Sequence, residues 1–246
     1  MPAPGQFILN KQVIPSELRS REWEAARVDY WRMERAFVMA GKVRFEDAQA
    51  CRNAAAALAN GKVSLIEARR AVREELERAG YRPTPGTTGT IKDIYTPRRL
   101  DVTLKTNVNM ARGYAEKNRL TGNAMYPASE LHRNRQSREP RDWQMRWNEA
   151  AASVNYEGVA RDGSFIALND SPIWAALSRW RTPYPPFDYG SGMWWRPVKW
   201  RVAEQKGLVT DEDMERIESQ RPESFNHDVA LEANVRAEDL GAAMAE

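Results

Sequence analysis

The chain has few of the residues from which disulfides and metal sites are built. One cysteine, Cys51, and two histidines, His132 and His227, occur among its 246 residues. A single cysteine cannot form an intrachain disulfide, so nothing in the sequence indicates an oxidising compartment. Two histidines so far apart in sequence can hold zinc only if the fold brings carboxylates to them. The sequence therefore predicts no metal site and no cofactor.

Long apolar runs and phosphate-binding glycine loops are also missing. No stretch approaches the roughly 20 apolar residues of a transmembrane helix, and the first residues lack the order of a signal peptide. Neither GxGxxG nor GxxxxGK followed by Ser or Thr occurs. We therefore expect a soluble chain made inside a cell, without membrane association and without nucleotide hydrolysis.

Charge is unevenly distributed along the chain. The formal net charge is +3, but from Ala203 onward there are twelve acidic and four basic residues, a net charge of −8 that leaves +11 for the first 202 residues. A basic body with an acidic tail is typical of proteins attracted to a polyanion, with the tail acting as a mask or a partner-binding segment. The alternative is that both parts are ordinary solvated surface.

Tryptophan, proline and glycine are concentrated between residues 172 and 200. Three prolines and two glycines predict that residues 183–192 form an ordered but irregular loop, because proline fixes φ and glycine permits angles closed to other residues. The aromatic residues beside this loop either pin it to the core or form a contact surface. We favour a packed loop held by Trp174, Tyr184, Pro185, Pro186, Phe187, Gly192, and Trp194 or Trp195.

Helical patterns dominate the first 80 residues. Trp23, Tyr30 and Phe37 share one face of a predicted helix that ends at Gly41, and this aromatic face is either core or interface. Two further helices are predicted: residues 45–58, ended by Asn60-Gly61, and a helix begun by the capping box of Ser64 and Glu67 that ends near Gly80.

The remaining elements follow a connection rich in Pro, Gly and Thr at residues 82–90, which places a domain boundary near residue 85. Local patterns then predict several elements. They are a helix with Leu100, Leu104, Val108 and Ala111 on one face, a helix from Asp142 to Ala152, a hairpin over Val154–Leu168 that turns at Asp162-Gly163, a short helix from Ser171-Pro172, and a helix from Thr210 to about Gln220.

These elements predict an α+β protein that is predominantly helical. We expect an N-terminal helical region over residues 1–85, followed by a compact domain over 86–209 in which a small antiparallel sheet packs against helices. Residues 210–246 are predicted to form an acidic C-terminal helix and tail.

Three segments carry a family resemblance: GTIKDIYTPRRLDVTLKTNVNMARGYA, YPASELHRNRQSREPRDWQMRW and DSPIWAALSRWRTPYPPFDYGSGMWWRPV. In their order and spacing they resemble the phage Mu protein F-like, or head morphogenesis, family of minor capsid proteins. The likeness covers roughly residues 86–209. Many family members carry a Cys-x-Cys pair where this chain has Ser191-Gly192-Met193, so no metal or redox role is carried over.

The resemblance implies a minor structural protein of a bacteriophage or prophage head. Its partners would be the portal protein and other head proteins, together with packaged DNA bound without sequence preference. The protein would lie in the interior of the virion head, and in the host cytoplasm during assembly. Its work would be head morphogenesis, genome packaging or ejection, without enzymatic activity.

His132 is the candidate for the alternative function of a metal-independent nuclease. It lies among several arginines, with Glu130 nearby. Histidine, glutamate and arginine can together move the protons of phosphodiester cleavage and hold the phosphate. We favour a structural hydrogen bond or a phosphate contact for His132, and the catalytic role remains the alternative.

An arginine-rich stretch predicts contact with nucleic acid or with an acidic partner surface. Five arginines alternate here with two tryptophans that can stack on unpaired bases. Trp143 and Trp147 lie four residues apart, so they can also face the core of a helix whose arginines are solvated. The five candidate contact residues are Arg133, Arg135, Arg138, Arg141 and Arg146.

Overall fold

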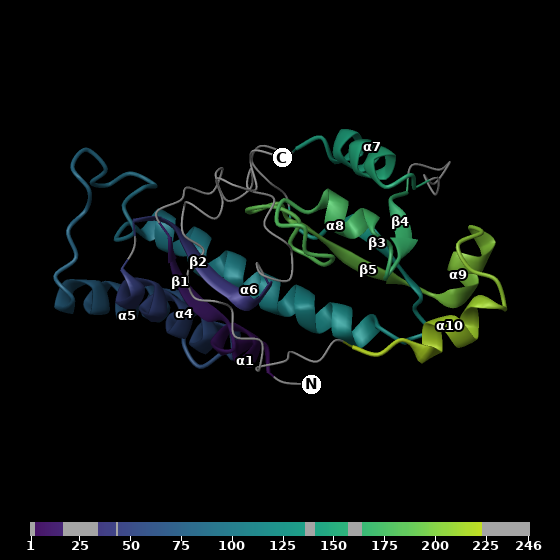
Figure 1. Ribbon diagram of the computed structural model, residues 1–246, viewed down its shortest axis with the longest axis horizontal. Coiled ribbons are helices and arrows are strands. Elements are labelled where there is room, and N and C mark those ends of the chain that lie inside the picture. The colour runs from purple at the N-terminus through teal and green to yellow at the C-terminus, as the bar shows by residue number, and fades with distance from the viewer. Residues whose placement is uncertain (1–2, 17–33, 43, 136–140, 157–163, 223–246) are drawn as a thin grey trace, which may run out of the picture. The chain divides into compact units, whose positions relative to one another are not determined.

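A computed structural model describes residues 3–16, 34–42, 44–135, 141–156 and 164–222 (Figure 1). The chain divides into two compact units. The N-terminal unit contains the described residues up to Ala111, and the C-terminal unit spans Arg112–Ser224. Their boundary falls within the helix α6 (Pro97–Leu120). The boundary predicted near residue 85 from loop composition stays a prediction.

The N-terminal unit combines short and long helices with a two-stranded parallel sheet. Its elements before α6 are α1 (Pro4–Leu9), β1 (Gln12–Ser16), β2 (Ala36–Lys42), α4 (Phe45–Ala59) and α5 (Leu65–Arg78). The predicted capping box is present, since Ser64 Oγ accepts from the backbone N–H of Glu67 and the Glu67 carboxylate accepts from that of Ser64. The α6 side chains predicted to share a face, Leu100, Leu104, Val108 and Ala111, are all buried.

The helix predicted to run to Gly41 is wrong from Ala36 onward. There the chain forms β2, which pairs in parallel with β1, Phe37 lying opposite Val13. Phe37 and Met39 are both buried, as expected for alternate residues on one face of a strand. Apolar residues in this segment fit both the two-residue repeat of a strand and the 3.6-residue repeat of a helix. Pairing with β1, which no local pattern reveals, selects the strand. Trp23 and Tyr30 lie outside the described residues.

The C-terminal unit contains a three-stranded antiparallel sheet with helices around it. After α6 come β3 (Ala128–Arg133), α7 (Trp143–Ser153), β4 (Ile166–Leu168), α8 (Ile173–Leu177), β5 (Met193–Val198), α9 (Trp200–Gln205) and α10 (Asp213–Ser219). The strand order is β4-β3-β5. The helix predicted from Asp142 is present, capped by the Asp142 carboxylate, which accepts from the Met145 N–H at 2.8 Å.

The hairpin predicted over Val154–Leu168 is wrong in its first strand and in the partner of its second strand. Residues 154–156 complete the C-terminal end of α7, and the backbone N–H of Tyr156 donates to Ala151 O at 2.8 Å. The second half does form a strand, β4, but β4 pairs antiparallel with β3. The predicted turn at Asp162-Gly163 lies outside the described residues.

The two faces of this sheet have different surroundings. On one face, Ala128, Ile166 and Val198 pack with residues of α9 and α10. Alternate residues such as Leu131 and Trp195, which are paired across β3 and β5, are buried on the other face. Both faces therefore contribute to the core of this unit.

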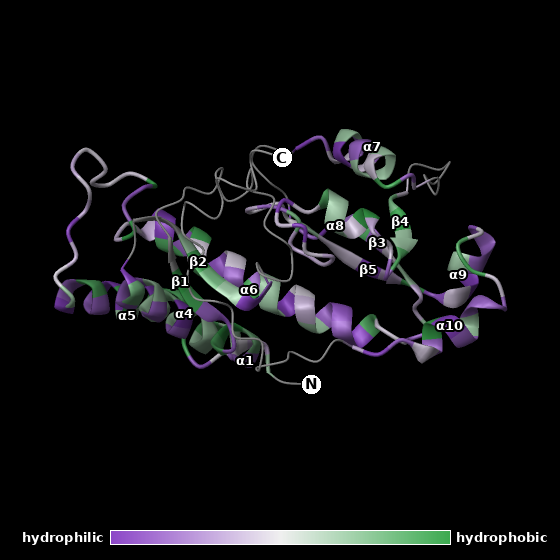
Figure 2. Cartoon of the chain, viewed as in Figure 1, coloured by the Kyte–Doolittle hydropathy of each residue, from purple (hydrophilic) through white to green (hydrophobic). Residues whose placement is uncertain are grey.

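The architecture is α+β and predominantly helical, as predicted. Polar residues are interspersed along α6, the longest helix in the described ranges (Figure 2). No helix among the described residues combines the length and the apolar character that a membrane span requires.

Candidate functional site

The loop over residues 183–192 is irregular, as predicted, and it lies directly against α6. A Cβ atom added to Gly113 would lie 1.7 Å from the carbonyl oxygen of Pro185, so the helix and loop backbones touch at this point. Beside this contact, Tyr114 and Tyr184 meet edge to face, with ring centroids 5.8 Å apart. Tyr184, Pro185, Pro186 and Phe187 are all buried.

Trp174 lies at the centre of the aromatic core beneath the loop. Its ring centroid is 5.5 Å from that of Trp147, 5.7 Å from that of Phe187 and 5.2 Å from that of Trp195. Its indole N–H donates to Leu168 O at 2.8 Å, so the polar atom of this buried ring is satisfied. Of the two tryptophans proposed to hold the loop, Trp195 is buried and Trp194 is partly exposed.

Gly192 closes the loop in a conformation that favours glycine. Its φ is +67°, and a Cβ atom at this position would lie 2.2 Å from Arg135 O. The backbone N–H groups of Asn134 and Arg135 both donate to Gly192 O. The end of the loop is thereby fastened to the end of β3, and any larger residue would disrupt this junction.

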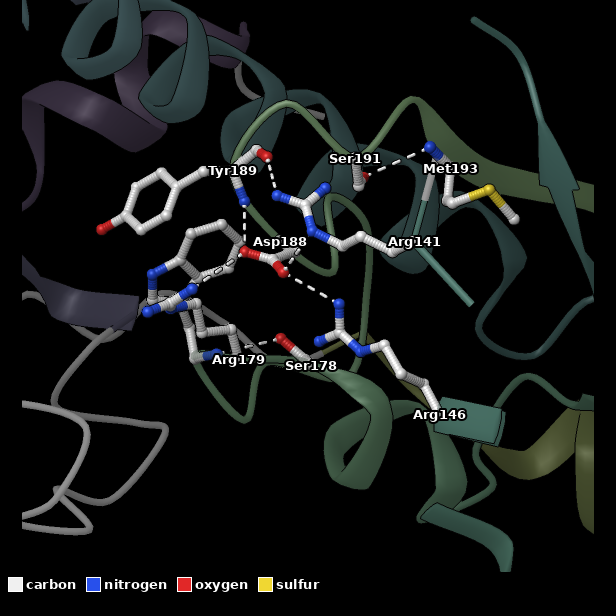
Figure 3. Close-up of polar contacts among 9 residues, drawn as sticks. Arg141, Arg146, Ser178, Arg179, Asp188, Tyr189, Ser191 and Met193 are labelled. Atoms are coloured by element: carbon white, nitrogen blue, oxygen red, sulfur yellow. Dashed lines mark hydrogen bonds and ion pairs between the residues drawn. The ribbon is translucent and has the colours of Figure 1, made fainter. Parts of the chain in front are cut away.

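The loop presents one buried carboxylate, Asp188, to three arginines (Figure 3). Oδ2 of Asp188 lies 3.2 Å from Nε of Arg141 and 2.8 Å from Nη1 of Arg146. Oδ1 lies 3.4 Å from Nη1 of Arg179 and accepts from the backbone N–H of Tyr189 at 2.7 Å. We call Asp188, Arg141, Arg146 and Arg179 the arginine cluster.

Aromatic rings hold two of these guanidinium groups in place. Arg146 lies over the ring of Trp143 at 4.5 Å, and Arg179 lies 5.4 Å from the ring centroid of Tyr189. Tyr189 in turn meets Trp180 edge to face at 4.9 Å. Stacking on aromatic faces favours arginine over lysine at both positions.

The structure separates the five arginines predicted to contact nucleic acid or an acidic partner. Arg141 and Arg146 belong to the arginine cluster. Arg135 is exposed, and Arg133 is half-buried in β3, where its Nη1 has no hydrogen-bond partner within the described ranges. Arg138 lies outside the described residues.

Of the two interpretations of Trp143 and Trp147, the structure favours the core. Trp147 is fully buried, and Trp143 is 5% exposed. An indole without exposed area cannot stack on a nucleotide base, so any contact with nucleic acid in this segment has to come from the arginines.

His132 lies in β3 and is partly exposed, with Trp194 opposite it in β5. The nearby carboxylate, Glu130, accepts from Nε of Arg196 at 3.0 Å and is held in that ion pair. A general acid and base pair needs two groups that can exchange protons with a substrate. Arg196 therefore engages the carboxylate that lies closest to His132 in sequence, and both roles considered for this histidine stay predictions.

Metal ligands do not gather in the described part of the chain. No three His, Cys, Asp or Glu side chains there come together as a metal site requires. Cys51 is fully buried in α4, and burial, with a smaller effect of Asp47, raises the pKa of its thiol to about 12. A thiol that stays protonated is a poor nucleophile and a poor ligand.

Sequence reasoning missed two members of the arginine cluster, Arg179 and Asp188. The signal was present, because Asp188 is the one carboxylate in a loop otherwise made of aromatic residues, prolines and small residues. A lone charge within an apolar, ordered segment requires a partner of opposite sign. Which arginines supply it depends on the fold, since Arg141 and Arg146 are more than 40 residues away.

Comparisons of the chain with protein-family models, with curated proteins and with solved structures give no match.

Proposed function

We propose that this chain is a minor structural protein of a bacteriophage or prophage head, associated with the portal vertex and with the packaged DNA. It acts in head morphogenesis or in genome packaging and ejection. The portal protein and other head proteins are its protein partners, and its place is the interior of the virion head. During assembly it is present in the host cytoplasm.

The packing of the resembling segments supports this proposal. The strand with His132, the helix with Trp174 and the loop with Pro185-Pro186 are far apart in sequence, yet they belong to one compact unit. Trp174 and Trp195 touch, and β3 pairs with β5 along its whole length. The second and third resembling segments therefore share one core, as motifs of one domain do, while most of the first segment, residues 89–115, belongs to the N-terminal unit.

The absence of a cysteine pair from the loop is compatible with this role. Where the resembling family often has Cys-x-Cys, the chain has Ser191-Gly192-Met193, and Gly192 joins the loop to the end of β3 through backbone contacts. Ser191 Oγ accepts from the Met193 N–H at 3.2 Å. The loop is thus held by packing and hydrogen bonds, as a structural protein requires.

Mass spectrometry of purified particles from the phage or induced prophage that encodes this chain tests the proposal. We expect a few copies per particle, and we expect the tagged chain to capture the portal protein from infected cells. A tagged capsid protein of the same particles serves as the positive control. Particles that contain no trace of the chain would exclude this function.

A further inference from the structure

We propose that the exposed face of α6 binds the phosphodiester backbone of double-stranded DNA through four basic residues. We call these residues the α6 stripe: Arg98, Lys105, Arg112 and Arg119. The choice of DNA as the polyanion rests on the proposed function, in which packaged DNA is a partner. The surface itself rests on the spacing, the exposure and the charges of these side chains.

The four residues recur every seven positions along one continuous helix. Seven residues are close to two helical turns, so each residue lies about 10.5 Å further along the helix axis than the one before, with a rotation of about 20°. The α6 stripe is therefore about 31 Å long and rotates by about 60° in all, which keeps it on one face. About nine base pairs of duplex have the same length, since the duplex axis rises about 3.4 Å per base pair.

The exposed surface of α6 has charges of one sign. After Pro97, the residues of this helix that are exposed are the four members of the α6 stripe. Leu100, Leu104 and Val108 are buried on another face, so the helix is amphipathic. A helix face that is only solvated typically alternates the sign of its charges, whereas basic residues along one face are typical of a surface that attracts a polyanion.

Two members of the α6 stripe carry charges that no described residue neutralises by direct contact. Neither Arg98 nor Arg112 forms an ion pair, a hydrogen bond or an aromatic contact within the described part of the chain. Each guanidinium group therefore keeps its five N–H donors available to a second molecule. Planar guanidinium groups suit bidentate contact with phosphate oxygens.

The other two members are paired at the surface. Lys105 Nζ lies 3.0 Å from Oδ2 of Asp101, and Arg119 Nη2 lies 2.6 Å from Oε1 of Glu116. The side chains of Lys105 and Arg119 are 48% and 44% exposed. Exposed pairs of this kind contribute little to stability, so both basic groups can exchange a carboxylate for a phosphate at little cost.

The two carboxylates leave the α6 stripe with an excess of positive charge. Asp101 and Glu116 are the only acidic residues in α6. Asp101 is also shared with α5, because Nε of Arg69 lies 3.5 Å from its Oδ1. Four positive charges thus face two carboxylates, one of which serves a further arginine, and the excess lies at Arg98 and Arg112.

The spacing allows four like charges to share one helix without strong repulsion. Neighbouring members are separated by about 10.5 Å along the axis, which exceeds the screening length of about 8 Å at physiological ionic strength. Together they create a positive potential along the helix. No aromatic or amide side chain of α6 is exposed, so the surface presents no group for stacking on bases or reading their edges. Contact is therefore with the DNA backbone, without preference for base sequence.

Binding of the full-length chain to a fluorescent 20-base-pair duplex, measured at several salt concentrations, tests the inference. We expect Arg98→Gln and Arg112→Gln each to lower the affinity about three- to tenfold and to reduce the slope of log K against log salt by about 0.9. Arg201→Gln is the matched control, because it removes the same charge from an exposed position of α9. Equal losses in all three variants, or no loss in the two α6 variants, would overturn the inference.

Chemical acetylation of the wild-type chain provides a readout that does not depend on a variant folding. Lys105 is the lysine of the α6 stripe, and Lys199 is an exposed lysine between β5 and α9. We expect saturating duplex to slow acetylation of Lys105 at least threefold and to leave Lys199 unchanged, as followed by mass spectrometry of peptides. Unchanged acetylation of Lys105, or equal protection of both lysines, would contradict the assignment to α6.

An acidic protein surface is the other polyanion that a basic helix face could contact. Suppose that the double variant Arg98→Gln/Arg112→Gln binds the duplex as the wild type does but captures less portal protein from infected cells. That result would reject DNA and identify the α6 stripe as a protein interface. We expect the reverse, with weaker binding of the duplex and unchanged capture of the portal protein.

Failure of this inference differs from failure of the proposed function. A double variant that still enters particles, and whose affinity for DNA equals that of the wild type, would reject the α6 stripe as a DNA-binding surface and leave the head-protein role intact. A wild-type chain that binds the duplex through α6 but is absent from purified particles would reject the head-protein role and leave the surface intact.

Discussion

At the scale of single residues, Asp188 determines how distant parts of the chain are joined. Its carboxylate ties the loop to Arg141, which precedes α7, to Arg146 within α7, and to Arg179, which follows α8. A buried carboxylate with four donors is stable only as long as those donors stay in place. Asp188 therefore has a structural role, because it holds three separate segments of the C-terminal unit together.

Replacing Asp188 with Asn should destabilise the C-terminal unit. The amide keeps the shape of the side chain but turns an N–H₂ group toward arginine donors, and the three arginines lose the negative charge of Asp188. We expect a loss of about 2–3 kcal/mol in the free energy of unfolding. Urea unfolding measures it, with Asp211→Asn at an exposed position as the control. Equal stability of the two variants would show that the cluster does not stabilise the fold.

At Gly113, local helix propensity and tertiary packing predict opposite changes in stability when glycine is replaced with alanine. Alanine is favoured over glycine inside a helix by about 1 kcal/mol. A Cβ atom at Gly113 would nevertheless lie 1.7 Å from Pro185 O, and backbone cannot yield as a flexible side chain can.

We therefore expect Gly113→Ala to destabilise the protein by about 3 kcal/mol or more, despite its better helix propensity. Thermal unfolding provides the measurement, and alanine at the exposed position Lys105 of the same helix is the control. A stabilised Gly113→Ala variant would mean that the loop does not rest on α6.

At the scale of elements, the sequence predicted those helices that are marked by capping residues or by a regular apolar face. The capping box of α5, the cap of α7 and the buried stripe of α6 all depend on residues within one or two turns of each other. Strands depend on partners elsewhere in the chain, so β2, β3 and β5 were missed. Pro197 also argued against a strand at β5, because proline cannot donate a hydrogen bond within a sheet. The strand tolerates this proline because β5 lies at the edge of its sheet.

The thiol of Cys51 in α4 predicts how stability depends on alkaline pH. Burial raises the pKa of this thiol from 9.0 to about 12 in the folded chain. Above pH 9 the unfolded chain loses the proton while the folded chain keeps it. The resulting contribution to stability is complete below pH 9 and is lost as pH rises from 9 toward 12.

Cys51→Ala should abolish this dependence. Between pH 9 and 10.5 we expect the stability advantage of the wild type over the variant to shrink by about 2 kcal/mol. Urea unfolding under reducing conditions at several pH values measures it. Tyr81 and Tyr156, whose pKa values burial also raises, are present in both proteins and cancel in the difference. A constant difference across this range would show that the thiol ionises in the folded state.

At the scale of the whole molecule, the two proposed functions, a structural head protein and a nuclease, require different surroundings of His132. Catalysis requires a second titratable group that is free to exchange protons with a substrate. Glu130 is held by Arg196, and Trp194 lies opposite His132.

We expect His132→Ala to leave any cleavage of single-stranded RNA or DNA by the purified chain unchanged. Gel analysis of both substrates after prolonged incubation is the measurement, and the matched control is the partly exposed neighbour Arg133→Ala. Cleavage that disappears in His132→Ala alone would establish the nuclease alternative.

The sequence by itself determined the fold class, the positions of the capped helices α5 and α7, and the irregular loop over residues 183–192 with its packed aromatic residues. These features follow from local chemistry: caps, periodicity, fixed φ angles and the cost of exposing indole rings. Only the tertiary structure decided that β4 pairs with β3, that Pro185 rests on Gly113, and that Asp188 gathers three arginines. Each of these depends on groups brought together from distant positions, and no local pattern records which distant group will be the neighbour.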